Sequence, residues 1–213
     1  MLGVAKLRRL DADANRHFQA FVEQYQGRNF IKEAYQKMAW QELINGSPEG
    51  YHRYMKACRH KGHAIAGGDK NAQQEAEKGQ APNLSLLKAR LLFDGGYFQK
   101  GYHMLNSKES NNFSQPDWKL EYYYRMGRLL HGLERHDEAI QYYRFTIENG
   151  AGFPHFYACN AALQMGLIYE AKGDLANARS AFNRCLEIDP DEYRTGLHQK
   201  AKSGLARLER RPR

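Results

Sequence analysis

Three side chains close together near position 60 are candidates for metal binding. Cys58, His60 and His63 are of the residue types that bind zinc. Lys61 and Gly62 mark the end of a helix at this point, and no carboxylate or fourth ligand is close in sequence. The spacing therefore predicts no metal site.

The chain has three cysteines, an odd number without the spacing of a disulfide framework. Cys58, Cys159 and Cys185 are therefore expected to be buried, reduced thiols. Cys185 follows Phe182 by three residues, which places it on the buried face of a helix as a small hydrophobic side chain.

Motifs of enzymes are absent from the sequence. It contains no His-Glu-x-x-His, Gly-x-Ser-x-Gly or Cys-x-x-Cys, and no glycine-rich phosphate loop after a strand. The pair Gly95-Gly96 is explained by a turn between helices. We therefore predict that the chain is not an enzyme and uses no cofactor.

The charge of the chain favours acidic partners. Lys and Arg total 32 against 24 Asp and Glu, a formal net charge of +8. Such a balance attracts acidic peptides, nucleic acid and anionic lipid. The excess is partly concentrated at the C-terminal end, where only Glu209 opposes a series of basic residues: Arg194, Lys200, Lys202, Arg207, Arg210, Arg211 and Arg213.

Two stretches of the sequence repeat each other. When Gly127 is aligned with Gly166, a small residue follows twelve positions later in both stretches and an aromatic residue four positions after that. A glycine on one helix and an alanine on the next let two antiparallel helices approach closely, and the aromatic ring fills the space beside the crossing. The signature residues are Gly127, Ala139 and Tyr143 in the first stretch, and Gly166, Ala178, Phe182 and Pro190 in the second.

This pattern resembles the tetratricopeptide repeat, a helix–turn–helix unit of about 34 residues. The resemblance implies an all-α fold in which antiparallel helix pairs stack into a right-handed superhelix, an α-α solenoid. The match is clearest over 115–190, although the spacing from Gly127 to Gly166 is 39 because the connection at 148–154 is longer.

Fainter repeats are expected before position 115. Ala89 and Gly101 are again twelve residues apart, and Leu105 follows four residues later. A helix over 30–44 and a partner starting at Ser47-Pro48 form a degenerate pair. We predict one domain over 1–213, with degenerate repeats at 1–107 and a capping helix at 191–210.

The first helices of such repeats line a concave groove, where a partner peptide would bind. Arg beside Tyr suits an extended peptide that carries carboxylates. In the chaperone-binding members of the family, a set of Lys, Asn and Arg holds a C-terminal carboxylate; Tyr124 and Arg128 occupy two of those places, which argues against that ligand. The helical register predicts the following groove residues: Arg90, Glu121, Tyr124, Arg125, Arg128, His131, Asn160 and Gln164.

The predicted function is a non-catalytic scaffold that binds another protein or peptide. A nucleic-acid-associated basic repeat protein is the alternative, and it is disfavoured because the aromatic residues occupy packing positions. Leu2, Val4 and Leu7 do not supply a polar cap for the first repeat, so a homodimer through the N-terminal end, or a longer array of which this chain is the C-terminal part, is a further expectation. The chain is expected to be cytoplasmic if complete, and periplasmic or membrane-anchored if it is a fragment of a secreted protein.

Overall fold

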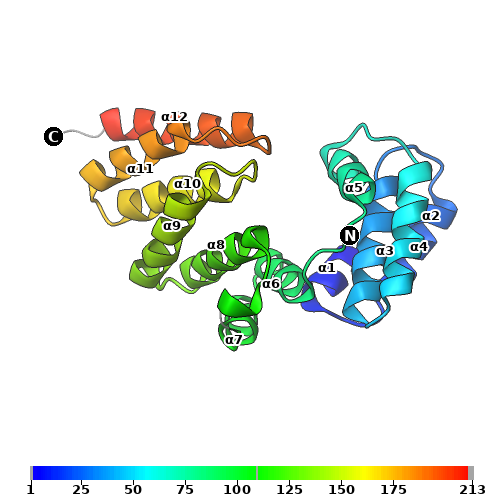
Figure 1. The fold of residues 1–213 in the computed structure, drawn as a ribbon. Coiled ribbons are helices and arrows are strands. Elements are labelled where there is room, and N and C mark those ends of the chain that lie inside the picture. The colour runs from blue at the N-terminus through cyan, green and yellow to red at the C-terminus, as the bar shows by residue number, and fades with distance from the viewer. Residues whose placement is uncertain (1, 109, 211–213) are drawn as a thin grey trace. The chain divides into compact units, whose positions relative to one another are not determined.

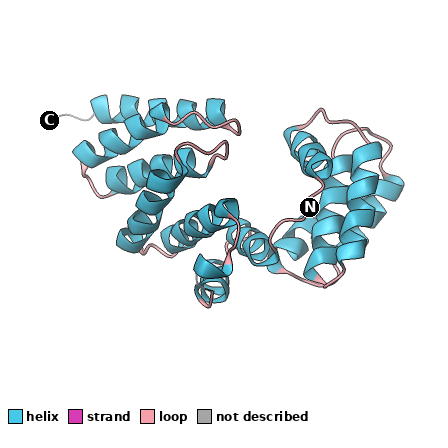
Figure 2. Ribbon diagram, viewed as in Figure 1, coloured by secondary structure: helices cyan, strands magenta, loops and turns pink. Residues whose placement is uncertain are grey.

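The computed structural model describes residues 2–108 and 110–210, and in that part of the chain all regular structure is helical (Figure 2). Arg211 and Arg213 of the basic C-terminal end lie outside the described residues. None of the described helices is long and apolar enough to cross a membrane. The all-α fold predicted from the sequence is confirmed.

Contacts divide the chain into two compact units, which we call unit 1, ending at Gly101, and unit 2, beginning at Tyr102. The expectation of one domain over 1–213 stays a prediction. Figure 1 shows the order of the helices within each unit. Unit 1 contains α1 (Leu2–Arg9), α2 (Asn15–Gln24), α3 (Ile31–Ile44), α4 (Pro48–His60), α5 (Gly67–Lys78) and α6 (Leu84–Asp94).

Helix α3 is the centre of unit 1, because α2, α4 and α5 all pack against it. Apolar residues of all these helices form one cluster that includes Met38, Trp40 and Tyr51. Leu7 is only 1% exposed and belongs to the same cluster. The expectation that Leu7 is part of an uncapped apolar end was therefore wrong, whereas Leu2 is 57% exposed.

Polar side chains tie α3 to α5 and α4. The Glu75 carboxylate of α5 accepts hydrogen bonds from Gln36 Nε2 at 2.6 Å, Trp40 Nε1 at 2.8 Å and the Tyr51 hydroxyl at 3.1 Å. Asp69, which is fully buried, accepts from the backbone N–H groups of the first turn of α3. Unit 1 is therefore held together by buried polar groups as well as by its apolar core.

Unit 2 is a series of helix pairs. Helix α7 (Phe98–Asn106) spans the boundary, and a 3-10 turn over Ser110–Asn112 precedes α8. Within unit 2 each helix packs against the next along the chain from α8 onwards, and α10 also contacts α8 and α12. The helices are α8 (Pro116–Gly132), α9 (His136–Gly150), α10 (Tyr157–Ala171), α11 (Leu175–Glu187) and α12 (Arg194–Glu209).

Glycines under aromatic rings set the spacing of these pairs. A Cβ atom on Gly127 of α8 would lie 2.7 Å from the ring of Tyr143 of α9. A Cβ atom on Gly166 of α10 would lie 2.5 Å from Cδ1 of Phe182 on α11. Because real Cβ atoms do not approach other atoms so closely, only glycine permits these crossings.

A third crossing of the same kind was not predicted. A Cβ atom on Gly204 of α12 would lie 2.6 Å from the Phe182 ring, which is therefore enclosed by glycines of α10 and α12. Gly204 follows Gly166 by 38 positions, almost the spacing from Gly127 to Gly166. The spacing was visible in the sequence, but α12 was interpreted only as a cap. The apolar face of α12 is buried at Leu197, Ala201 and Leu208.

Candidate functional site

The site begins at Tyr124, which faces from α8 towards α10. Its hydroxyl accepts a hydrogen bond from Arg128 NH1 at 2.9 Å, one turn further along α8. Asn160 of α10 bonds to the same hydroxyl at 2.7 Å, and Gln164 Nε2 donates to Asn160 Oδ1 at 3.1 Å. These four residues form a continuous polar chain across the two helices, which we call the α8–α10 network.

Arg125 lies beside the network but is buried. It is 8% exposed and forms an ion pair with Glu121 at 2.7 Å. Its guanidinium carbon is 5.3 Å from the centre of the Tyr124 ring and 5.9 Å from that of Tyr157. Burial alone would lower the pKa of Arg125, but the Glu121 carboxylate outweighs it and raises the pKa above its usual value. Arg125 is therefore a charged structural group whose charge is balanced within α8.

His131 contributes no charge to this face near neutral pH. Burial, together with smaller contributions from the neighbouring His136 and Arg128, lowers its pKa to about 4. Its Nδ1 lies 3.4 Å from the Tyr143 hydroxyl. His131 therefore links the first helix of the pair to the second rather than presenting a cation.

Glu170 and Arg207 connect α10 to α12. Arg207 donates from Nε to Oε1 of Glu170 at 2.9 Å and from NH2 to Oε2 at 2.6 Å, the two-pronged geometry that guanidinium and carboxylate groups favour. Glu170 is 8% exposed, so this pair fixes the charge of a buried carboxylate. Arg207, one of the basic residues of the C-terminal end, is therefore already paired with a carboxylate of the same chain.

A second polar cluster lies at the start of α10. His155 Nε2 is 3.4 Å from Asp117 of α8 and its Nδ1 is 3.6 Å from Glu192. The hydrogen bond to Glu192 raises the pKa of His155, partly opposed by burial. The long connection that carries His155 is also tied to the loop before α12, since Asp191 N donates to the Pro154 carbonyl at 2.9 Å.

Seven of the eight predicted groove residues lie in unit 2. Six of them are in or beside the α8–α10 network, and His131 is one turn further along α8. The eighth, Arg90, lies in unit 1, where its guanidinium carbon is 5.0 Å from the centre of the Trp40 ring. Whether any of the eight binds a partner stays a prediction.

Some residues expected to be exposed on this face are buried. Tyr124 is 1% exposed and Asn160 8%, because the two side chains bond to each other in the space between α8 and α10. Two further residues of α10 are also buried: Leu163, in the apolar cluster of α10 to α12, and Glu170, which is paired with Arg207 of α12. The exposed part of the face is carried by half-buried Arg128 and Gln164 and by Leu167, which is 37% exposed.

The residues of the repeat signature are all buried in the structure: Ala89, Gly101, Gly127, Ala139, Tyr143, Gly166, Ala178, Phe182 and Pro190.

Sequence reasoning missed the cluster around His155. Its two carboxylate partners are 38 and 37 positions away in the sequence, and no repeat or motif connects them. Only the folded connection between α9 and α10 brings the three together.

The described residues contain no group of three or more His, Cys, Asp or Glu side chains placed to hold a metal ion. His60 and His63 are exposed. The cysteines are buried and unbridged, and Cys159 Sγ lies 3.6 Å from Cys185 Sγ between α10 and α11. The predictions of no cofactor and no enzymatic activity stay predictions.

Comparison with known families gives one match. The tetratricopeptide repeat family matches residues 120–144 and 160–192, which cover most of α8 to α11. No curated protein and no solved structure matches the chain. The matched segments include both glycine–aromatic crossings of the predicted repeats and the whole α8–α10 network.

Proposed function

The chain is a tetratricopeptide-repeat protein over residues 120–144 and 160–192, and from that premise we propose that it is a non-catalytic module that binds an extended segment of a partner protein along α8 and α10. Repeats of this family generally mediate contacts between proteins. The family is typically non-catalytic. The observation that carries the proposal is the α8–α10 network, a chain of polar groups on the first helices of two successive repeats.

The chemistry of the network suits a peptide backbone. Arg128 offers charged N–H donors, and Gln164 offers both a donor and an acceptor. An extended peptide presents carbonyl and N–H groups at regular spacing, so these groups match its hydrogen-bonding needs. Arg128 is the cation of the network, and Leu167 adds an exposed apolar contact one turn beyond Gln164. We therefore expect a segment with a carboxylate side chain near Arg128 and an apolar side chain near Leu167.

The network is also rigid before any partner arrives. Tyr124 and Asn160 are bonded to each other and buried, so they hold Arg128 and Gln164 in place. Side chains that are already ordered lose less conformational entropy on binding. The buried residues are thus positioning groups, and the half-buried ones make the contacts.

Selection of displayed random peptides against the full chain tests this proposal. We expect selected peptides to be enriched in Asp or Glu and to lose about tenfold in affinity for Arg128→Glu, because a charged hydrogen bond is replaced by repulsion. Arg125→Glu is unsuitable as a variant because Arg125 is buried, and its loss would unfold the helix pair.

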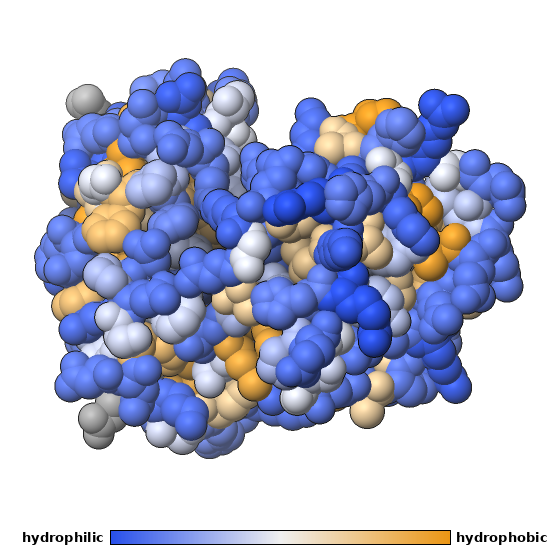
Figure 3. All heavy atoms as spheres, turned by 45° about the vertical axis from the view of Figure 1, so that its right-hand side comes forward, coloured by the Kyte–Doolittle hydropathy of each residue, from blue (hydrophilic) through white to orange (hydrophobic). Residues whose placement is uncertain are grey.

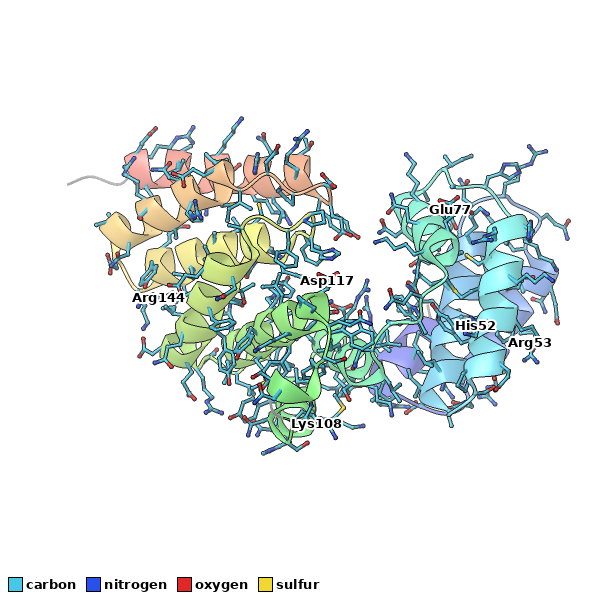
Figure 4. The ribbon with its side chains drawn as sticks, viewed as in Figure 1. His52, Arg53, Glu77, Lys108, Asp117 and Arg144 are labelled. Carbon is cyan, nitrogen blue, oxygen red and sulfur yellow. The ribbon has the colours of Figure 1, made fainter. Side chains whose placement is uncertain are left out.

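Arg144→Glu is the matched control, since it makes the same change of charge on the exposed surface of α9. Figure 4 shows Arg144 away from Asp117, which marks the first turn of α8. Selected peptides should bind this variant as tightly as the original chain. Equal losses for both variants, or none for Arg128→Glu, would exclude the α8–α10 network as the binding site.

Nucleic-acid binding is the alternative function, and we do not propose it. Among the basic residues of α12, Arg194 is paired with Asp189 at 2.7 Å and Arg207 with Glu170. The positive charge of the other basic residues of the chain would attract an acidic peptide as well as a polyanion, so it gives no reason to prefer nucleic acid. Retention of RNA or DNA at low salt that falls steeply as salt rises would revive this alternative.

A further inference from the structure

Two connections of unit 1 lie side by side at one end of the α3–α4 pair. They are residues 25–30, between α2 and α3, and residues 61–66, between α4 and α5. His63 N donates to the Arg28 carbonyl at 3.3 Å. Gly62 lies so close to Ile31 that a Cβ atom would be 2.7 Å from that of the isoleucine. We call this pair of connections the loop tip.

Two large apolar side chains of the loop tip are mostly in solvent: Ile65 is 63% exposed and Phe30 52%. Tyr25 is 40% exposed, with its ring stacked on Phe21 at 4.8 Å between centroids. Figure 3 shows a small hydrophobic patch at the upper edge of unit 1, bordered by hydrophilic side chains. Because these side chains are exposed and do not line a pocket, they suit contact with a membrane or a protein surface better than binding of a small molecule.

The backbone holds Phe30 in this exposed position. Its φ of 67° lies in the left-handed region, which bulky residues seldom adopt. Its N–H donates to Asp69 Oδ2 at 2.6 Å, and the other oxygen of the buried Asp69 accepts from Glu33 N at 3.0 Å. Helix α5 therefore fixes an unusual conformation whose result is an aromatic ring in water, and such outliers are found preferentially at functional positions.

Within the two connections the formal charges have one sign. Neither 25–30 nor 61–66 contains an acidic residue, whereas Arg28 and Lys61 are exposed there; the flanking carboxylates are Glu23 of α2 and Glu33 of α3. Tyr193 provides a contrast within the same chain. It too is an aromatic residue with positive φ before a helix and is 53% exposed, but Asp189, Asp191 and Glu192 precede it directly.

We propose that the loop tip binds an anionic membrane surface, with Phe30 and Ile65 entering the headgroup region and Arg28 and Lys61 lying against lipid phosphates. Apolar side chains inserted at the interface together with nearby cations form the usual two-part signal for peripheral binding. A protein partner needs a far larger contact area than these few side chains supply. Ile65 has no ring on which a nucleic-acid base could stack, so a polynucleotide is the less suitable ligand.

Co-sedimentation of the full chain with vesicles tests the proposal. We expect binding to vesicles of phosphatidylserine and phosphatidylcholine in equal amounts, and weak binding to phosphatidylcholine alone. The double variant Phe30→Asn/Ile65→Ser should lose about tenfold or more in affinity, because it withdraws two apolar side chains from the interface. Asparagine tolerates positive φ, so the fold of this variant is preserved.

Two further variants separate apolar from charged contributions. Arg28→Gln should lower the affinity about fivefold at low salt and less at high salt. Tyr193→Asn is the matched control, with the same change of residue type in the same backbone conformation, and should bind as the original chain does.

Fluorescence adds a measurement that does not depend on affinity. In Phe30→Trp, brominated lipids should quench the new tryptophan more strongly than they quench the original chain, whose two tryptophans are the buried Trp40 and the half-buried Trp118. The proposal is overturned if no vesicle binds, if phosphatidylcholine alone binds equally well, or if Phe30→Asn/Ile65→Ser binds normally. It is also overturned if RNA or a polyglutamate peptide binds the loop tip and vesicles do not.

Discussion

Units 1 and 2 are both built from paired helices, but different interactions hold the pairs together. In unit 2 an aromatic ring of one helix lies over a glycine of another, as Tyr143 does over Gly127. In unit 1 the carboxylates of Glu75 and Asp69 on α5 accept hydrogen bonds from side-chain and backbone donors of α3. The comparison shows that a helix pair can be specified by shape or by buried polar groups, and only shape leaves a periodic trace in the sequence.

The largest expected effect concerns the shape of unit 2. Gly166→Leu should destabilise the chain by about 3 kcal/mol, because the new side chain must displace the Phe182 ring. Gly127→Leu and Ala139→Leu should act in the same way at the first crossing. Urea unfolding monitored by circular dichroism measures the change.

Two controls accompany these variants. Gly196→Leu places the same side chain in α12, where nothing lies within 4 Å, and should be neutral or slightly stabilising. Arg128→Leu should also be nearly neutral. Equal tolerance of Gly166→Leu and Gly196→Leu would mean that the crossings are not held by glycine.

The matching prediction for unit 1 concerns Glu75. Glu75→Ala should destabilise by about 2 kcal/mol, because Trp40 and Gln36 lose their acceptor and Tyr51 keeps only the Gln80 carbonyl at 3.4 Å. Glu77→Ala changes an exposed carboxylate on the same helix and should have little effect. If the two variants unfold at the same urea concentration, the hydrogen bonds to Glu75 do not stabilise unit 1.

Acid should weaken unit 2 through His131. Since its pKa is lowered to about 4 by burial, the unfolded chain binds the proton more readily than the folded one. The stability it contributes is complete above its usual pKa of 6.5 and is lost as pH falls towards 4. His131→Gln should reduce that loss by about 1 kcal/mol, which urea unfolding at pH 7 and pH 4.5 measures; an unchanged difference would contradict the burial of this ring.

Alkali should act on unit 1 through Lys37. Burial lowers its pKa to about 8, with Glu33 opposing and Arg90 adding to the shift. The unfolded chain then holds more protons than the folded chain between pH 8 and the usual value of 10.5, so stability rises with pH across this range. In Lys37→Met this increase of stability with pH should disappear. Hydrogen exchange measured segment by segment should show the difference between the variant and the original chain in α3. A rise of the same size in the variant would contradict this assignment.

The sequence predicted unit 2 better than unit 1 for a physical reason. Glycine and aromatic residues at fixed offsets identified the pairs around Gly127 and Gly166. The helix predicted over 30–44 is α3 in the structure, and the capping helix predicted at 191–210 is α12. The ties of unit 1 join residues 24 to 39 positions apart, such as Tyr51 and Gln36 to Glu75, and no local pattern records them.

The candidate site was predicted from the helical register. In the structure Tyr124, Arg128, Asn160 and Gln164 are joined by hydrogen bonds, and their role in binding stays a prediction. Their exposure could not be predicted, because it depends on how closely α8 approaches α10. The loop tip left only a weak signal, the aromatic and basic residues of two connections that the fold alone brings together.

Hydrogen exchange of the full chain, with and without a peptide selected by display, tests the central claim most directly. The account predicts slower exchange within 116–132 and 157–171, the residues of α8 and α10, and unchanged exchange in α9 and in unit 1. Protection confined to α9 and α11, or to unit 1, would contradict it.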